Sequence, residues 1–101
     1  MAYKILISPE AEQDVSDAFS WYEDRRPGLG QDFLLHVEAG LHLIARNPLI
    51  CAEVYRETRC CYTKRFPYKI IYIVAPDHVR ILAVLHHRRN PTEVMVRQTD
   101  K

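Results

Sequence analysis

The sequence predicts an α+β domain in which an antiparallel helical hairpin packs on a small antiparallel sheet. Two observations support this prediction. Apolar residues recur at helical spacing in the first half of the chain, whereas residues 58–86 alternate as strands do. The chain has 101 residues, which is the length of one domain, so we expect residues 1–101 to form a single two-layer unit.

A short strand and then a helix are expected at the start of the chain. Residues 3–7 have the pattern of a strand, and Ser8-Pro9-Glu10 is typical of a helix start. Serine can cap free amide groups, and proline suits the first helical position. One face of this helix is apolar and consists of Ala11, Val15, Ala18, Phe19 and Tyr22. The helix should end near Arg25-Arg26-Pro27-Gly28.

A second helix should follow the tight break at residues 27–30. Its apolar face contains Phe33, Val37, Leu41 and Ile44, and Asn47-Pro48 stops it because the residue before proline disfavours helix. Two helices joined by so short a break should pack antiparallel.

The second half of the chain predicts a three-stranded antiparallel meander. Residues 58–65 are rich in Thr, Tyr and Cys and alternate, and residues 68–74 give the strongest strand pattern in the chain. Residues 79–86 alternate after a turn at 75–78. Short turns between consecutive strands produce antiparallel pairing. We also expect one helical turn from Asn90 onward.

Charge is distributed unequally along the chain. Residues 1–50 carry four Lys or Arg and eight Asp or Glu, a net charge of −4, whereas residues 51–101 carry ten and five, a net charge of +5. The molecule should therefore be electrically polar, with a basic half that can face an acidic partner. The sequence contains no apolar run long enough to cross a bilayer and no signal peptide, so we expect a cytoplasmic protein without membrane contact.

The three cysteines, Cys51, Cys60 and Cys61, are expected to stay unpaired. Their number is odd, and two of them are adjacent in the sequence, where direct pairing is strained. They are interpreted as small hydrophobic residues in a reducing compartment. No metal-ligand spacing and no nucleotide-binding motif occurs, so neither metal nor cofactor is expected.

Two basic segments are the candidates for function. Residues 64–69 lie where one strand turns into the next, and residues 86–91 end the last predicted strand. In a meander they could form one cationic patch containing Arg65, Lys69, Arg88 and Arg89. Such a patch could bind phosphates, cleave RNA without a metal, or dock on an acidic protein. Trp21 and Tyr22 are interpreted as core or hairpin packing.

Six motifs in order resemble the ParE branch of the ParE/RelE superfamily of bacterial toxins. They are Ser8-Pro9-Glu10-Ala11-Glu12-x-Asp14, Trp21-Tyr22-Glu23, Pro27-Gly28-Leu29-Gly30-x-x-Phe33, Ile44-x-x-Asn47-Pro48, Arg65-Phe66-Pro67-Tyr68 and Leu85-His86-x-x-Arg89-x-Pro91. The resemblance covers nearly the whole chain. It implies the same fold and the toxin role of a type II toxin–antitoxin system, a class that includes plasmid stabilization modules.

The resemblance also implies partners and a target. A cognate ParD-like antitoxin would wrap the toxin and fill an apolar groove, in an assembly such as two plus two, and would bind operator DNA itself. ParE toxins are associated with inhibition of DNA gyrase, whereas RelE toxins cut messenger RNA on the ribosome. Aligning the strands places RelE active-site arginines at Lys69 and Arg89, but the terminal RelE tyrosine falls at Met95. The nuclease set is therefore incomplete, which favours the ParE branch.

Three hypotheses follow. The first is a non-enzymatic gyrase inhibitor, with a target-binding surface drawn from Arg65, Tyr68, Lys69, Arg88 and Arg89. The second is a ribosome-dependent RNA endonuclease that uses Lys69, Arg89 and the histidines His86 or His87. The third is a non-toxic protein that only binds the antitoxin. In each case the antitoxin should contact the apolar surface at Leu34, Leu35 and Leu43.

Overall fold

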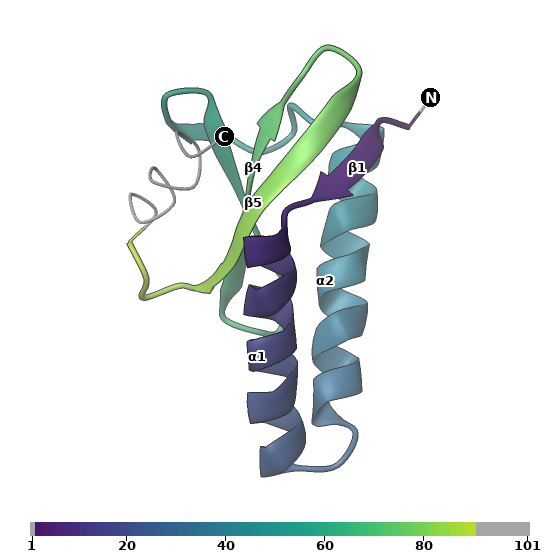
Figure 1. Ribbon diagram of the computed structural model, residues 1–101, viewed down its shortest axis with the longest axis vertical. Helices are drawn as coiled ribbons and strands as arrows, with labels where there is room; N and C mark the ends of the chain where they lie inside the picture. Colours follow the sequence, from purple (N-terminus) through teal and green to yellow (C-terminus); the bar gives the residue numbers. More distant parts are fainter. Residues whose placement is uncertain (1, 91–101) are drawn as a thin grey trace.

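The computed structural model describes residues 2–90, and the helical hairpin and the meander occur in the predicted order (Figure 1). The elements are β1 (Lys4–Ile7), α1 (Pro9–Arg25), α2 (Leu29–Arg46), β2 (Glu53–Tyr55), β3 (Thr58–Tyr62), β4 (Tyr68–Val74) and β5 (His78–His86). The α+β fold class is confirmed. The helical turn expected beyond Asn90 and the comparison at Met95 both fall outside the described residues.

The sheet contains two strands more than the predicted meander. Its five strands have the order β1-β5-β4-β3-β2. β1 pairs with β5 in parallel, with Ile5 opposite Val79, and the three-residue β2 pairs with β3 at the other edge. The sequence did not reveal β2 because three residues are too few to display a period of two. Local patterns also do not indicate a pairing between residues more than 70 positions apart.

The two helices cover one face of the sheet and bury the main core against it (Figure 1). Phe33 and Ile44 of α2 meet Ile70 and Tyr72 of β4, all completely buried. The Tyr72 hydroxyl donates to the carbonyl of Pro48 at 2.6 Å, so this buried phenol keeps a hydrogen-bond partner. A smaller apolar cluster of Cys60, Ile71, Ala83 and Leu85 is also buried. It lies on the opposite face because side chains alternate along strands.

α1 is fastened to the outer edge of β5. The amide of Ser8 donates to the carbonyl of Ile81 at 3.1 Å, and the Ser8 hydroxyl donates to the carbonyl of Leu82 at 3.4 Å. The same hydroxyl oxygen accepts the amide of Ala11, which is the predicted N-cap. One turn further along α1, the carboxylate of Asp14 accepts the amide of Val84 at 3.1 Å.

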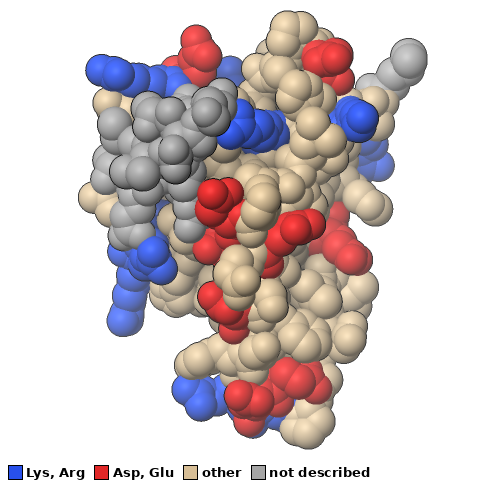
Figure 2. Space-filling model, viewed as in Figure 1, with Lys and Arg blue, Asp and Glu red and all other residues tan. Residues whose placement is uncertain are grey.

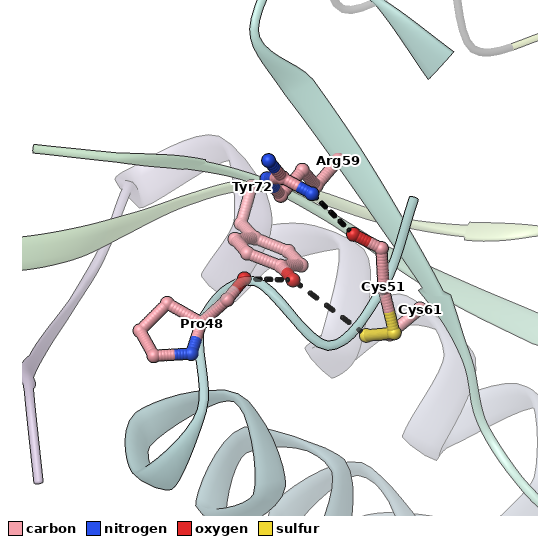
Figure 3. Close-up of a disulfide and its surroundings, with 5 residues drawn as sticks. All are labelled: Pro48, Cys51, Arg59, Cys61 and Tyr72. Carbon is pink, nitrogen blue, oxygen red and sulfur yellow. Dashed lines mark hydrogen bonds between the residues drawn. A yellow bond between two sulfur atoms is a disulfide. The ribbon is translucent and has the colours of Figure 1, made fainter. Parts of the chain in front are cut away.

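The expectation that all three cysteines stay unpaired is wrong, because the structure joins Cys51 to Cys61 in a disulfide (Figure 3). Their Cα atoms lie 5.4 Å apart, which suits a disulfide. The two cysteines meet because β2 and β3 pair between them as a hairpin, and the sequence did not reveal β2. Cys60 remains a buried free thiol whose pKa is raised by that burial.

Replacing Ser8 by alanine should lower the free energy of unfolding by about 1–2 kcal/mol, because α1 loses both its N-cap and its bond to Leu82. Urea denaturation followed by circular dichroism measures this loss. Ser16→Ala, at an exposed position within α1, is the matched control and should change stability by less than about 0.5 kcal/mol. Equal effects of the two substitutions would contradict the assigned role of Ser8.

Candidate docking site

A groove of about 510 Å³ lies between α1 and one end of the sheet. Tyr68 begins β4 and His86 ends β5, and their Cα atoms are opposite each other in the antiparallel ladder. Its walls include Asp14, Asp17 and Trp21 from α1, and Tyr68, His86 and Arg89 from the sheet side. The groove therefore combines aromatic rings with acidic and basic groups.

The α1 wall follows from helical spacing. Asp14, Asp17 and Trp21 lie three and four residues apart and so share one side of the helix. Trp21 is 53% exposed, so of its two predicted roles, core packing and hairpin packing, the role in the core is wrong. The Arg25 guanidinium, one turn later, lies 3.9 Å from the centre of the indole ring in a cation–π contact. The neighbouring Tyr22 packs against the main core, as predicted.

A cluster of aromatic rings supports the groove from below. Tyr22 and Phe33 each contact Phe66 and Tyr68 as well as each other, with ring centres 5.0–6.1 Å apart and mostly edge to face. Burial raises the pKa of the Tyr22 phenol, and Tyr68 raises it further. The Phe66-Pro67-Tyr68 motif thus ties the β3–β4 turn to both helices.

The sheet wall places His86 and Arg89 beside Tyr68. The rings of His86 and Tyr68 lie 5.4 Å apart, and Nδ1 of His86 accepts the amide of Arg88 at 3.1 Å. Burial raises the pKa of the Tyr68 phenol, the positive charge of Arg89 opposes that rise, and Asp14 adds to it. The phenol therefore lies within the electrostatic influence of both walls.

The structure divides the predicted cationic patch. Lys69 is only 4% exposed, and its ammonium donates to the carbonyls of His87 at 3.3 Å and Arg89 at 2.6 Å. Because side chains alternate along β4, Lys69 also lies on the face opposite Tyr68. The ring of His87 packs on Tyr62 instead of lining the groove. Lys69 thus holds the turn after β5 in place and does not present its charge to a partner.

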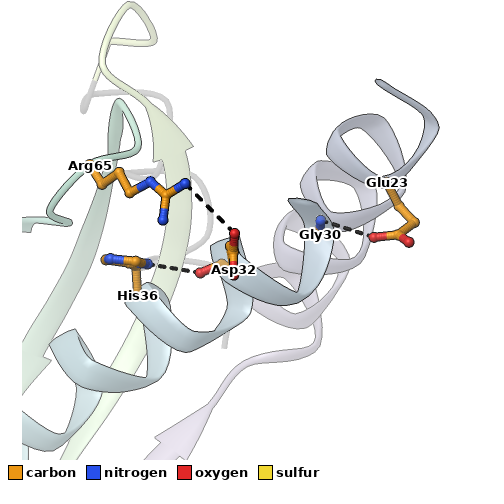
Figure 4. A network of polar contacts seen from close by, with 5 residues as sticks. All are labelled: Glu23, Gly30, Asp32, His36 and Arg65. Atoms are coloured by element: carbon orange, nitrogen blue, oxygen red, sulfur yellow. Dashed lines mark hydrogen bonds and ion pairs between the residues drawn. The ribbon is translucent and has the colours of Figure 1, made fainter. Parts of the chain in front are cut away.

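Arg65 lies against the helices, away from the groove (Figure 4). It adopts a φ of 71° in the β3–β4 turn, and its guanidinium reaches Asp32 of α2 at 3.7 Å. Asp32 also provides the backbone carbonyl that lies 2.8 Å from Nδ1 of His36. Arg88 is exposed in the turn after β5. Of the predicted target-binding residues, only Tyr68 and Arg89 therefore line the groove, together with His86 from the predicted nuclease set.

The charge asymmetry of the sequence corresponds to the two layers. Acidic side chains gather over the helical hairpin in Figure 2, and α1 alone carries six of them. The basic second half of the chain forms β2 to β5. The groove lies where the two layers meet, which explains why carboxylates line one wall and Arg89 and His86 the other.

The proposed antitoxin contacts occur on α2 with different exposures. Leu35 is 60% exposed and Leu43 is 39% exposed, whereas Leu34 is half-buried. Leu35, Ala39 and Leu43 follow one another at intervals of four residues, so they form an exposed apolar stripe. Leu34 therefore exposes less of its surface than Leu35 and Leu43 do.

Asp14, Asp17 and Trp21 were missed as site residues, although the sequence contained a signal for them. All three flank the apolar stripe of α1 on the same side, which places them at the border between core and solvent.

Within residues 2–90 no cluster of three metal-ligating side chains occurs, and neither helix is long and apolar enough to span a membrane.

Residues 5–91 match the family model described as the ParE toxin of the type II toxin–antitoxin system parDE. This chain belongs to the ParE toxin family. Over 95 residues it is 30% identical to Toxin ParE2 of Mycobacterium tuberculosis, covering 93% of this chain and 90% of the relative. The family predicted from the six motifs is thereby confirmed.

Two solved structures share the ParE-like fold. The chromosomal ParDE system from P. aeruginosa contains a chain that matches with a TM-score of 0.75 at 12% identity, covering 84% of this chain and 96% of that one. The RelBE2 toxin–antitoxin complex from Mycobacterium tuberculosis contains one that matches with a TM-score of 0.60 at 21% identity, covering 85% and 99%. At these identities the likeness supports the fold alone.

Replacing Lys69 by alanine should destabilise the protein by about 2–3 kcal/mol, because two carbonyls in the turn lose a charged donor. Thermal or urea unfolding measures the change. Lys64→Ala removes an exposed lysine from the same region and should change stability by less than about 0.5 kcal/mol. If the Lys69 variant were as stable as the wild type, the buried bonding role would be refuted.

Proposed function

We propose that this ParE-family toxin inhibits DNA gyrase by docking a gyrase surface in the groove between α1 and the sheet, and that a ParD-like antitoxin neutralises it. The observation that carries the target proposal is the mixed charge of the groove. Two carboxylates, three aromatic rings, an imidazole and a guanidinium can pair with the varied side chains of a protein.

The same mixture disfavours a nucleic acid as the direct target. Phosphates need a surface of one sign, and the carboxylates of Asp14 and Asp17 repel them from the α1 wall. Trp21 offers a protein partner a large exposed ring toward the C-terminal end of this wall, and aromatic side chains of this kind often dominate binding energies. A protein surface therefore fits the groove better than RNA does.

The alternative of a ribosome-dependent RNA endonuclease has weaker support. Its predicted residues were Lys69, His86, His87 and Arg89, but only His86 and Arg89 line one cavity. Lys69 uses its charge to bond the chain's own carbonyls, and His87 packs on Tyr62. General acid–base cleavage needs its groups around one scissile phosphate, and this set is divided between two faces of the sheet.

The apolar stripe of Leu35, Ala39 and Leu43 supports the antitoxin proposal. An amphipathic helix of the antitoxin would place its own apolar residues along this stripe, with the operator-binding part of the antitoxin further away. The P. aeruginosa and M. tuberculosis matches, which come from a ParDE system and a RelBE2 complex, are consistent with such a partner. We expect a hetero-oligomer such as two toxins with two antitoxins.

Induced expression without antitoxin should stop growth, and messenger RNA in these cells should stay intact. The purified toxin should inhibit supercoiling by gyrase. Trp21→Ala and Arg89→Ala should each weaken gyrase inhibition about ten-fold or more while the protein stays folded, because both side chains line the groove and are exposed outside the buried core. Supercoiling assays with purified toxin at increasing concentration measure the effect.

Arg46→Ala is the matched control, since Arg46 is an exposed cation in the last turn of α2 and does not line the groove. It should inhibit gyrase as the wild type does. Cleaved messenger with normal supercoiling would replace the gyrase proposal by the nuclease alternative. Growth without any arrest would instead favour the non-toxic partner hypothesis.

Leu35→Ala and Leu43→Ala should each weaken antitoxin binding by about ten-fold, because each removes an apolar side chain that the complex covers. Isothermal titration of the purified toxin with its antitoxin measures the dissociation constant. Val54→Ala changes an equally apolar exposed residue on β2 and should bind normally. Unchanged affinity in both α2 variants would exclude this stripe as the antitoxin surface.

A further inference from the structure

The segment between α2 and β2 is tied to the sheet by several contacts that meet around one disulfide. Tyr72 donates to the carbonyl of Pro48 at 2.6 Å, and Arg59 donates to the carbonyl of Cys51 at 2.7 Å (Figure 3). The amide of Cys60 donates to the carbonyl of Ala52 at 3.3 Å. The Cys51–Cys61 bond adds a covalent link to the same short segment.

We propose that Cys51–Cys61 is a reversible redox site that controls the stability of the toxin. The bond joins residues ten positions apart, and closing such a loop removes conformational freedom from the unfolded chain. Both states of the site can be accommodated by the fold. The hydrogen bonds to the backbone carbonyls of Pro48, Cys51 and Ala52 do not involve sulfur, so they keep the two cysteines close after reduction.

The two sulfurs differ in access. Cys51 is half-buried at the surface, whereas Cys61 is only 4% exposed beneath it. Of the two residues, Cys51 is therefore the one that an incoming thiolate can approach, although it also packs against the main core. Access of this kind is what disulfide exchange with small thiols requires. Once reduced, the Cys61 thiol also has an acceptor nearby, because its sulfur lies 3.8 Å from the Tyr72 hydroxyl oxygen.

The reductant is a low-molecular-weight thiol. Its thiolate attacks Sγ of Cys51, a mixed disulfide forms there, and the electron pair of the broken bond leaves on Sγ of Cys61 as a thiolate. A second small thiolate attacks the small-molecule sulfur of the mixed disulfide and releases Cys51 as a thiolate. The two protein thiolates each take up a proton from water, and one small-molecule disulfide is formed. Oxidation by that disulfide follows the reverse path.

Cys60 supplies a matched control within the same strand. It is adjacent to Cys61 but points to the opposite face of the sheet, where it is buried with Ile71 and Leu85. It cannot reach Cys51 from that face. The site therefore predicts one disulfide and one free thiol in the oxidised protein, with the free thiol at position 60.

The full chain is purified without reductant. One sample is denatured and alkylated, and its mass is measured to count the free cysteines. The melting temperature of the folded protein is recorded separately, in buffers of increasing ratio of small thiol to its disulfide. We expect one alkylated cysteine in the oxidised protein and three after equilibration of the folded protein with millimolar thiol. The melting temperature should fall by roughly 10 °C over the same range. Cys51→Ser should melt at the lower temperature in every buffer, and Cys60→Ala should keep the full shift.

Three results would overturn the proposal. Three alkylated cysteines without reductant would show that the bond does not form. A bond that survives millimolar thiol in the folded protein would make it permanent, and an equal thiol-dependent shift in Cys51→Ser would place the effect elsewhere. If Cys51→Ser failed to fold, the wild-type mass and melting curves would still decide among these outcomes. None of them depends on gyrase or antitoxin binding.

Discussion

The outer edge of β5 is the constraint on which the rest of the molecule depends. β1 pairs with this edge as far as Ile7 opposite Ile81, and then the chain turns into α1. From there the edge has no strand beside it, yet a buried strand cannot leave its polar groups unpaired. Ser8 and Asp14 of α1 take over from β1 and bond the backbone of Ile81, Leu82 and Val84. The hydrogen bonding along the edge of β5 is thus begun by β1 and continued by Ser8 and α1.

A bulge in β5 lies at the same place. Ile71 is opposite Ala83 and Tyr72 is opposite Ile81, so Leu82 is the extra residue of β5. The position of α1, and with it the α1 wall of the groove, is therefore fixed by backbone bonding as well as by apolar packing. Asp14 combines both roles, since its carboxylate holds Val84 and also lines the groove.

Local features of the sequence predicted the elements well because each helix and long strand has its own cap, breaker or period. Ser8 and Asn47 mark helix ends whichever elements pack nearby, and residues 68–74 form a strand on composition alone. The parallel pairing of β1 and the burial of Lys69 depend instead on which separate segments meet, and the Cys51–Cys61 disulfide depends on the short strand β2. Hydrophobic periodicity contains no information about which segments pair. The sequence could therefore suggest a cationic patch, but it could not predict that Lys69 and Arg65 lie apart from Arg89.

The two walls of the groove are held by different residues, and this affects how substitutions should be interpreted. The α1 wall depends on Asp14, whereas the turn that carries Arg89 is held by the ammonium of Lys69 through the Arg89 carbonyl. If the groove is the docking surface proposed above, loss of Lys69 would displace Arg89 and weaken inhibition of the target, although Lys69 itself is buried. A scan of toxicity alone would class Lys69 and Arg89 together. Unfolding measurements distinguish them, because Lys69 is buried and its ammonium bonds two backbone carbonyls, whereas the Arg89 side chain lies in the exposed turn outside the buried core.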